Sequence, residues 1–399
     1  MTDVSVQQSA ALDAIAHWRE DRDRPVFTMF GAAGTGKTHT IKELIADDVL
    51  FATYTGKAAH VLRRKGVPAV TIHSLIYLPK EKSRYRLERL EGQLVDLKAE
   101  MPEEDVANSQ AVRSLNERIA EEKKQLSRPA FSLNPDSDLR QAKLLVVDEV
   151  SMVDSRMADD LLSFDVPILA VGDPYQLPPV AGTGYFLKKK PDVLLTEVHR
   201  QAAESPIIRL ATTIREGRRP QPDGQMVVPW GSISPDAALG YEQIIVGRNK
   251  TRKATNHRIR GLRKLADPLP VAGDRVICLR NNHDMGLLNG SIWQVVDRSG
   301  ADDIIDLVVK DENGEMAVPV WRHHFVDSVY EPTQLAFWEK QEAEEFDYGY
   351  AVTCHKAQGS EWDSVLVFDE SGAFGADASR WLYTAVTRAA KTLTLVTRN

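Results

Sequence analysis

Short apolar runs, each ending in a glycine or a polar turn, recur through the first 180 residues. Four have the length and composition of buried strands, at residues 25–30, 49–53, 144–147 and 167–171. Segments of helical character lie between them, as at 38–44. Strands that alternate with helices predict a parallel sheet that is covered on both faces.

The pattern changes between residues 79 and 128. Apolar residues recur at spacings of three and four in two series: Leu87, Leu90, Leu94, Leu97 and Met101, then Val112, Leu115, Ile119 and Leu126. Pro102 and a polar stretch to Gln110 separate the two series. This spacing predicts an antiparallel pair of amphipathic helices. The pair is an insertion, because strand-like sequence resumes beyond it.

A second change comes between residues 271 and 327, where β segments are expected at 274–279, 291–296, 304–309 and 316–320. Asn289-Gly290 and Asn313-Gly314 mark tight turns between them. The spacing predicts a small barrel-like module. Strand-like runs at 365–368 and 392–396 then predict a second α/β domain that carries this module as an insertion.

The composition limits the possible classes. A chain of 399 residues is too long for one core and suits two or three domains. Its two cysteines, Cys278 and Cys354, lack metal-ligand spacing, which favours a reducing, cytoplasm-like compartment over disulfides or zinc. No apolar run reaches membrane-spanning length and no signal-peptide core is recognised, so we expect no membrane partner.

The charge distribution leaves two interpretations open. A net charge of −7 counts against nucleic-acid binding. The basic residues are nevertheless clustered, at Lys57, Arg63, Arg64 and Lys65 and again at Arg248, Lys250, Arg252, Lys253, Arg258, Arg260, Arg263 and Lys264. Such clusters fit either a basic track for a strand or solvated helix faces.

The segment from Gly31 to Thr38 matches the phosphate-binding loop G-x-x-x-x-G-K-[ST] between a predicted strand and a predicted helix. We expect the loop residues Gly34, Thr35 and Gly36 to turn backbone amides toward the phosphates of ATP. Lys37 would place its charge at the β- and γ-phosphates, and the Thr38 hydroxyl would ligate Mg²⁺.

Two further motifs follow predicted strands. Asp148 and Glu149 end the run Leu-Leu-Val-Val, where Asp148 would hold Mg²⁺ and Glu149 would polarise the attacking water. The sequence Gly-Asp-Pro-Tyr-Gln-Leu-Pro-Pro begins at Gly172. Its Gln176 amide could hydrogen-bond both the attacking water and the γ-phosphate.

These motifs, in this order, resemble those of the superfamily-one helicases, specifically the RecD-like and Dda-like branch. Further segments look like the later and the strand-contacting motifs of that family: TYTGKAA from Thr53, TIHSL from Thr71, LTEVHRQ from Leu195, AVTCHKAQGSE from Ala351 and LYTAVTRA from Leu382. The resemblance covers nearly the whole chain except the helical insertion. It implies an ATP-dependent 5′-to-3′ DNA helicase that acts on single-stranded DNA and tailed duplex DNA.

The fold that the resemblance implies has two RecA-like parallel-sheet domains with ATP in the cleft between them. The expected boundaries are 1–78 and 129–190 for the first RecA-like domain, 191–270 and 328–399 for the second, 79–128 for the inserted helical hairpin and 271–327 for an SH3-like inserted β module. The family usually carries a β-hairpin pin where this chain has helices, so the strand-separating wedge is left open. Phe131 and the turn at Asn134 are candidates for a reduced pin.

The resemblance also assigns residues. Gln8 would read adenine, with Gln7 as the alternative, and Gly359 and Glu361 would lie near the phosphates and ribose. Arg200 and Arg388 would reach the γ-phosphate from the second domain. Five residues would contact the strand, namely Thr55, Lys57 and His73 on the first domain and His355 and Lys356 on the second.

Three other functions are weighed against this one. A small-molecule kinase would not need arginine motifs far downstream of the phosphate loop, and a degenerate non-enzymatic clamp would not keep the site residues intact. A single-strand translocase, or a helicase that acts on RNA, shares most of these motifs and is the alternative that the sequence keeps.

Overall fold

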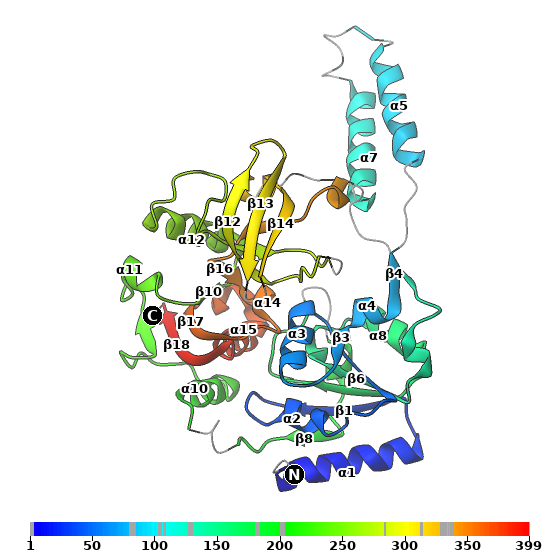
Figure 1. Ribbon diagram of the computed structural model, residues 1–399, viewed down its shortest axis with the longest axis vertical. Helices are drawn as coiled ribbons and strands as arrows, with labels where there is room; N and C mark the ends of the chain where they lie inside the picture. The colour runs from blue at the N-terminus through cyan, green and yellow to red at the C-terminus, as the bar shows by residue number, and fades with distance from the viewer. Residues whose placement is uncertain are drawn as a thin grey trace.

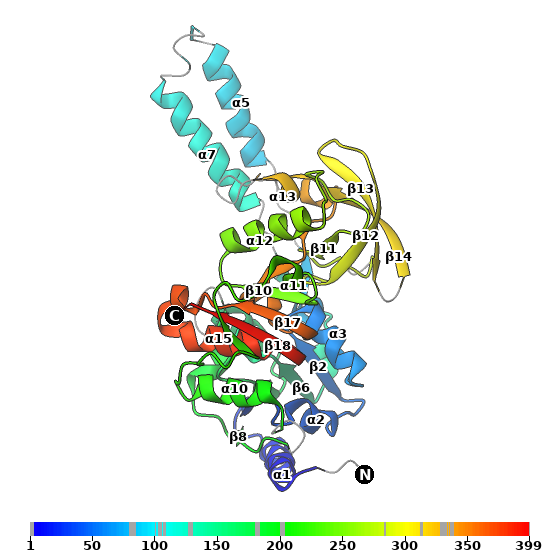
Figure 2. The same ribbon diagram turned by 90° about the vertical axis from the view of Figure 1, so that its left-hand side faces the viewer.

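The computed structural model describes residues 4–79, 85–99, 101–102, 106, 109–126, 131–179, 184–199, 204–282, 285–311, 314–327, 333, 335 and 339–398. Two parallel sheets and one antiparallel sheet make up its body, and a helical arm extends from it (Figure 1). Arm and N-terminal helix lie at opposite ends of the molecule in both views (Figure 2).

Six parallel strands form the first sheet, in the order β3-β2-β6-β7-β1-β8. They are β1 (Val26–Gly31), β2 (Val49–Thr53), β3 (Ala69–Thr71), β6 (Leu144–Asp148), β7 (Ile168–Gly172) and β8 (Val193–Leu195). Leu144 and Val146 pack with one helical layer, while Leu145 and Val147 pack with the other. Because strand residues alternate between faces, a sheet covered on both sides needs this unbroken apolar run.

The two layers over this sheet are short helices. On one face lie α1 (Val6–Asp21), α2 (Lys37–Lys42) and α3 (Gly56–Arg64), and on the other lie α4 (Ile72–Ile76) and α8 (Ser155–Leu162). The helix α1 begins at a capping box in which Ser5 and Gln8 satisfy each other's backbone amides.

The second parallel sheet has five strands in the order β16-β10-β17-β18-β9. They are β9 (Val227–Pro229), β10 (Gln243–Val246), β16 (Ala351–Thr353), β17 (Trp362–Phe368) and β18 (Ala389–Thr397). Helices α10 (Pro206–Arg215) and α15 (Ala378–Val386) cover one face. Helix α12 (Asn249–Leu262) and the antiparallel sheet cover the other. The predicted pair of parallel-sheet domains is thereby confirmed.

The antiparallel sheet has the order β14-β13-β12-β11-β15. Its strands are β11 (Arg275–Cys278), β12 (Ile292–Ser299), β13 (Ile304–Asp311), β14 (Gly314–Trp321) and β15 (Phe346–Tyr348). The remaining short elements are β4 (Tyr77–Pro79), β5 (Phe131–Leu133), α11 (Pro235–Ala238), α13 (His323–Val326), α14 (Cys354–Ala357), η1 (Asp138–Gln141), η2 (Val150–Met152), η3 (Tyr185–Lys188), η4 (Glu339–Gln341) and η5 (Ser371–Asp377). The likeness of the antiparallel sheet to an SH3-like barrel stays a prediction.

Two of the expected boundaries differ from the sheets. The second domain was expected to begin at residue 191, yet β8 pairs with β1 as the edge strand of the first sheet, from Met29↔Val193 to Gly31↔Leu195. The inserted module was expected to end at 327, yet β15 pairs with β11 in the antiparallel sheet. Both strands have only three residues, so their own sequence does not determine which sheet they join.

Several basic residues of α12 hold the antiparallel sheet in place. Arg260 and Asp274 form a buried ion pair, with Nε 3.0 Å from Oδ1, and Tyr350 donates to the same oxygen at 2.8 Å. Arg252 pairs with the buried Asp347 at 2.7 Å. A buried pair of this kind strongly destabilises a protein when one partner is removed. This part of the basic cluster is therefore structural, neither a strand track nor a solvated face.

Both cysteines, Cys278 and Cys354, are free and buried. Burial raises the pKa of the Cys278 thiol to about 12, which makes it unreactive at neutral pH. Among the helices that the structure describes, none combines the length and apolar content needed to cross a membrane.

The arm consists of α5 (Tyr85–Ala99) and α7 (Gln110–Leu126) and extends from the antiparallel β4–β5 pair (Figure 1). The helices lie where the leucine spacing predicts them. Leu87, Leu90 and Ile119 form a small core of their own, with Leu94 and Leu115 packed against it. This core is separate from the cores that cover the sheets.

A separate core predicts that the arm can be removed without unfolding the body. Replacing residues 80–130 by a short Gly/Ser linker keeps β4 and β5 and should shift the melting temperature of the body by no more than about 2–4 °C. Circular dichroism or calorimetry measures this shift. A loss of stability of roughly 10 °C or more would show that the arm supports the sheets.

Candidate functional site

The predicted chemistry lies along one edge of the first sheet. The phosphate-loop segment follows β1, Asp148 ends β6, and Asp173 follows β7. These three strands are neighbours in the order β6-β7-β1 and run parallel. The carboxyl edge of a parallel sheet is the usual place for a ligand site.

The loop after β1 depends on glycine. Gly34 and Gly36 have φ angles of 82° and 78°, a region that other residues seldom adopt. A Cβ atom on Gly36 would come within 2.2 Å of Gln8 Nε2. The loop ends where α2 begins at Lys37, whose Nζ donates to Gly31 O at 2.7 Å and to Ala32 O at 3.1 Å.

The two acidic residues at the end of β6 lie in different environments. Asp148 is buried and accepts a hydrogen bond from the Glu149 amide at 2.9 Å. Burial, and then the charge of Glu149, raise the pKa of Asp148 to about 6, while Lys37 acts in the opposite direction. Glu149 has a left-handed backbone, with φ of 56°. Such strain in a residue other than glycine costs on the order of 1–3 kcal/mol and is concentrated at functional sites.

The loop after β7 places a buried amide beside these carboxylates. Gln176 is only 5% exposed, and its Oε1 is buried with no hydrogen-bond partner in the described part of the chain. An unpaired buried acceptor costs about 1–3 kcal/mol, so its persistence here calls for a ligand or a water that donates to it.

A cavity of about 510 Å³ opens between the two parallel sheets at this edge. The first domain lines it with the phosphate loop, including Gly34, Lys37 and Thr38, and with Asp148, Glu149, Asp173 and Gln176. The second domain contributes Gly359, Ser360, Glu361, Thr387 and Arg388. Most of the predicted nucleotide-site residues therefore meet in one cleft.

Arg388 is held firmly on the far wall of that cleft. It is 7% exposed, and its guanidinium donates to Thr384 O and Ser360 O, each at 3.1 Å. Arg200, the other predicted arginine, lies outside the described residues. Its neighbour His199 binds the phosphate loop through its amide, which donates to Gly34 O at 3.2 Å.

One hydroxyl joins the two domains across the cleft. Tyr383 Oη, on α15, accepts from the Ala33 amide of the phosphate loop at 2.8 Å and donates to Asp173 Oδ2 at 2.6 Å. Asp173 is 1% exposed, and its other oxygen accepts from the Tyr175 amide. Burial and the Asp173 charge raise the pKa of Tyr383, so its hydroxyl keeps its proton.

Two more hydrogen bonds reinforce this contact. The Leu177 amide donates to Thr384 Oγ1, and Gln358 Nε2 donates to Leu177 O, each at 2.9 Å. Asp173, Tyr383 and Gln358 lie within the predicted motifs, but the sequence alone assigned them no role. Their place in motifs that flank the predicted nucleotide site was the only signal.

The N-terminal glutamines contact the protein itself. Gln8 is 1% exposed, accepts from the Ser5 amide at 2.9 Å and donates to Gly36 O at 3.3 Å. Gln7 Oε1 accepts from the amides of Thr196 and Glu197. Neither residue lines the cleft cavity, and adenine recognition by Gln8 stays a prediction.

Two of the predicted strand contacts lie at the domain interface. Thr55 caps α3, and a Cβ on Gly359 would come within 2.9 Å of its hydroxyl. Lys57 Nζ lies 4.2 Å from the centre of the Trp362 ring. Burial lowers the pKa of Lys57 to about 8. Glu361 faces the first domain as well, with Lys65 Nζ 3.9 Å from its Oε2.

The other three have different surroundings. His73 packs among the aromatic rings of Tyr54, Tyr77 and Phe131 at the base of the arm. The ring centres of His355 and Phe374 are 5.8 Å apart. Lys356 Nζ donates to Asn289 Oδ1 at 2.9 Å.

Comparison with known proteins supplies the family. The model of an AAA domain matches residues 3–226, and that of a UvrD-like helicase C-terminal domain matches residues 348–396. The ATP-dependent RecD2 DNA helicase of Deinococcus radiodurans is 27% identical over 97% of this chain. The chain spans about half the length of that curated relative, 48%.

Solved structures share the fold. The Pif1 helicase of Candida albicans has a TM-score of 0.52 at 19% identity, over 100% of this chain and 95% of that one. The Pif1 helicase of Bacteroides, in complex with ADP-AlF3 and single-stranded DNA, has a TM-score of 0.53 at 18% identity, over 99% and 92%. The chain thus belongs to the AAA-domain family, and it is similar to helicases of the RecD and Pif1 type.

Proposed function

We propose that this chain is an ATP-dependent helicase that moves 5′ to 3′ along single-stranded DNA and separates duplex DNA. The observation that carries the proposal is the single cleft that brings the phosphate loop, the acidic pair, Gln176 and Arg388 together from two domains. The named activities of the RecD2 and Pif1 relatives support the choice of DNA.

The residues in the cleft fit ATP and Mg²⁺. The glycine-dependent loop leaves backbone amides for phosphate oxygens, with Lys37 as the cation beside them. Thr38 and Asp148 carry the hydroxyl and carboxylate oxygens that Mg²⁺ prefers, and Mg²⁺ would neutralise phosphate charge. Gly359 and Glu361 would complete the second-domain side of the site.

Hydrolysis of ATP then needs a base, a water-positioning amide and a cation. Glu149, which follows β6 and lines the cleft, would be the base that polarises the water. Gln176 uses its unpaired Oε1 to hold the water. Arg388, and Arg200 with it, neutralises the charge that develops on the γ-phosphate, an effect worth about 10³–10⁵ in rate for such arginines.

Tyr383 couples this chemistry to domain closure. Its hydroxyl can satisfy the Ala33 amide and the Asp173 carboxylate only while α15 lies against the first domain. The same helix precedes Arg388, so the contact that closes the cleft also positions the arginine. We infer that Tyr383 is a positioning residue that acts through Asp173 and Arg388.

The contacts with the DNA strand would change as the two domains close and open. Thr55 and Lys57 lie where the domains meet, so opening the cleft changes their surroundings. His73 sits on the first domain, and His355 and Lys356 on the second, so the distance between the two groups depends on closure. Alternate grip by two groups moves a strand without reading its sequence.

Strand displacement tests the proposed function. A DNA duplex with a 5′ single-stranded tail should open with ATP and Mg²⁺, whereas blunt and 3′-tailed duplexes should stay paired, and RNA duplexes test the RNA alternative. Lys37→Ala should abolish opening, and Glu149→Gln should still bind ATP without turnover. Opening of only the 3′-tailed duplex would contradict the proposed direction of movement.

The chain in which a linker replaces residues 80–130 tests the role of the arm. If this chain keeps its ATPase activity but no longer opens the duplex, the arm is the wedge that separates the strands.

Tyr383→Phe tests the coupling role. The substitution keeps the ring and removes two hydrogen bonds, one of them to a carboxylate, which is worth about 1–3 kcal/mol. The stimulation of ATPase by single-stranded DNA should fall roughly tenfold, while the rate without DNA changes little. Steady-state ATPase with and without an oligothymidylate measures both rates.

Tyr175→Phe is the matched control, because its ring lies 6.1 Å from that of Tyr383 and its hydroxyl makes no hydrogen bond with the described residues. This control should keep normal stimulation. Equal losses with and without DNA in Tyr383→Phe would instead assign Tyr383 a purely structural role.

A further inference from the structure

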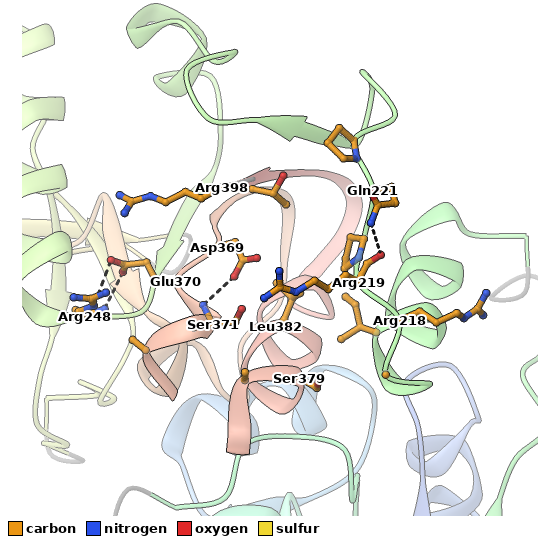
Figure 3. Close-up of a pocket in the computed structure, with 18 residues that line it drawn as sticks. Arg218, Arg219, Gln221, Arg248, Asp369, Glu370, Ser371, Ser379, Leu382 and Arg398 are labelled. Carbon is orange, nitrogen blue, oxygen red and sulfur yellow. Dashed lines mark hydrogen bonds and ion pairs between the residues drawn. The ribbon is translucent and has the colours of Figure 1, made fainter. Parts of the chain in front are cut away.

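A second cavity, of about 600 Å³, is lined by residues of the second domain alone (Figure 3). The connection after α10, the start of η5 and the first turn of α15 form its walls, with Ile214 and Leu382 as apolar lining. It shares no lining residue with the cleft cavity.

Arginine dominates this cavity. Arg218, Arg219, Arg248 and Arg398 line it, against the two carboxylates of Asp369 and Glu370. Glu370 is already engaged, because it accepts from the amides of Gly247 and Arg248 and from the Thr251 hydroxyl. Arg248 Nε lies 3.8 Å from Glu370 Oε1, and Arg218 pairs with Glu216, so two of the four arginines are balanced locally.

The other two arginines, Arg219 and Arg398, have no carboxylate partner in the described part of the chain. Arg219 is exposed, extends toward Asp369 and Ser371, and has no side-chain partner in the described part of the chain (Figure 3). Arg398 lies 4.3 Å over the ring of Trp230, which is 53% exposed. An arginine beside an exposed tryptophan combines a phosphate contact with a surface on which a base can stack.

The position of the cavity in the sheet connects it with the predicted strand contacts. All five strands of the second sheet are parallel, so their carboxyl ends share one edge. Along the order β16-β10-β17-β18-β9, this edge presents His355 and Lys356, then Arg248, the start of η5, Arg398 and Trp230. Four strand spacings of about 4.8 Å make this path roughly 19 Å long.

We propose that the arginine-lined cavity binds the phosphate backbone of the single strand as a continuation of the contacts at His355 and Lys356. Arg219 and Arg398 supply the phosphate contacts, and Trp230 supplies a stacking surface for a base. This inference rests on the proposed function and adds a second anchoring site on the second domain. Such a site would hold the strand while the first domain releases it.

Binding of oligothymidylates of two lengths tests the site. An oligomer of about 6 nucleotides is long enough only for the predicted strand contacts outside the cavity. An oligomer of about 16 nucleotides also reaches the arginine-lined cavity. The double variant Arg219→Gln, Arg398→Gln should bind the longer oligomer about five- to tenfold more weakly and the shorter one as wild type does. Its log–log salt slope on the longer oligomer should be shallower by roughly 1.4, at about 0.7 per lost contact. Fluorescence anisotropy over a salt series measures both quantities.

Arg218→Gln is the matched control, since it removes the same charge from the adjacent residue. Arg218 points away from Arg219 and pairs with Glu216 (Figure 3). This control should bind both oligomers normally, and all variants should keep the ATPase rate without DNA and the wild-type melting temperature.

Wild-type affinity of the double variant for the longer oligomer would overturn the inference, as would an equal loss on both lengths. Stimulation of ATPase by the shorter oligomer separates this failure from that of the proposed function. If the double variant keeps that stimulation, the helicase proposal stands without the second site. If the wild-type protein binds neither oligomer, both the proposed function and the inference fail.

Discussion

The hydroxyl of Tyr383 makes the contact on which the nucleotide site depends. Two parallel sheets each end in polar loops, and neither sheet alone surrounds a triphosphate. The hydroxyl accepts from Ala33 in the phosphate loop and donates to Asp173 after β7. Because Tyr383 and Asp173 are buried and Ala33 is partly buried, separating the domains would leave each of these groups without its partner. These hydrogen bonds therefore favour this arrangement of the two domains over arrangements that break them.

Three other features of the cleft fit a site that binds a ligand between the two domains. Asp148 has a pKa of about 6 because burial and Glu149 both oppose its charge, and a cation in the cleft would relieve that cost. Gln176 carries an unpaired acceptor, and Glu149 a strained backbone, at the same edge. Unfavourable features of this kind persist where a ligand compensates them.

The sequence predicted the parts whose physical requirements are local. Runs such as residues 144–147 must be apolar throughout, because alternate residues pack on opposite layers. The phosphate loop is recognisable because Gly34 and Gly36 need positive φ angles. In contrast, β8 and β15 are only three residues long, and partners far away in the chain determine which sheet each one joins.

Charge patterns were the least informative signal, because a basic residue looks the same in a salt bridge and in a binding groove. Arg252 and Arg260 proved to be partners of buried aspartates, whereas Arg219 and Arg398, outside the predicted clusters, remain available to a ligand. Tyr383 was missed for a related reason, since its partners lie 350 and 210 residues away in the chain.

The distance between the two domains in each ligand state tests the central claim most directly. Since Cys278 and Cys354 are buried, fluorescent labels can be placed at the new surface cysteines of Asp47→Cys and Asp236→Cys. Single-molecule energy transfer should show a single short distance with a non-hydrolysable ATP analogue and single-stranded DNA. Without ligands the distribution should be broader, and Tyr383→Phe should keep it broad even with both ligands bound. An identical distribution in every ligand state, for both proteins, would contradict the claim that this hydroxyl couples ATP to closure.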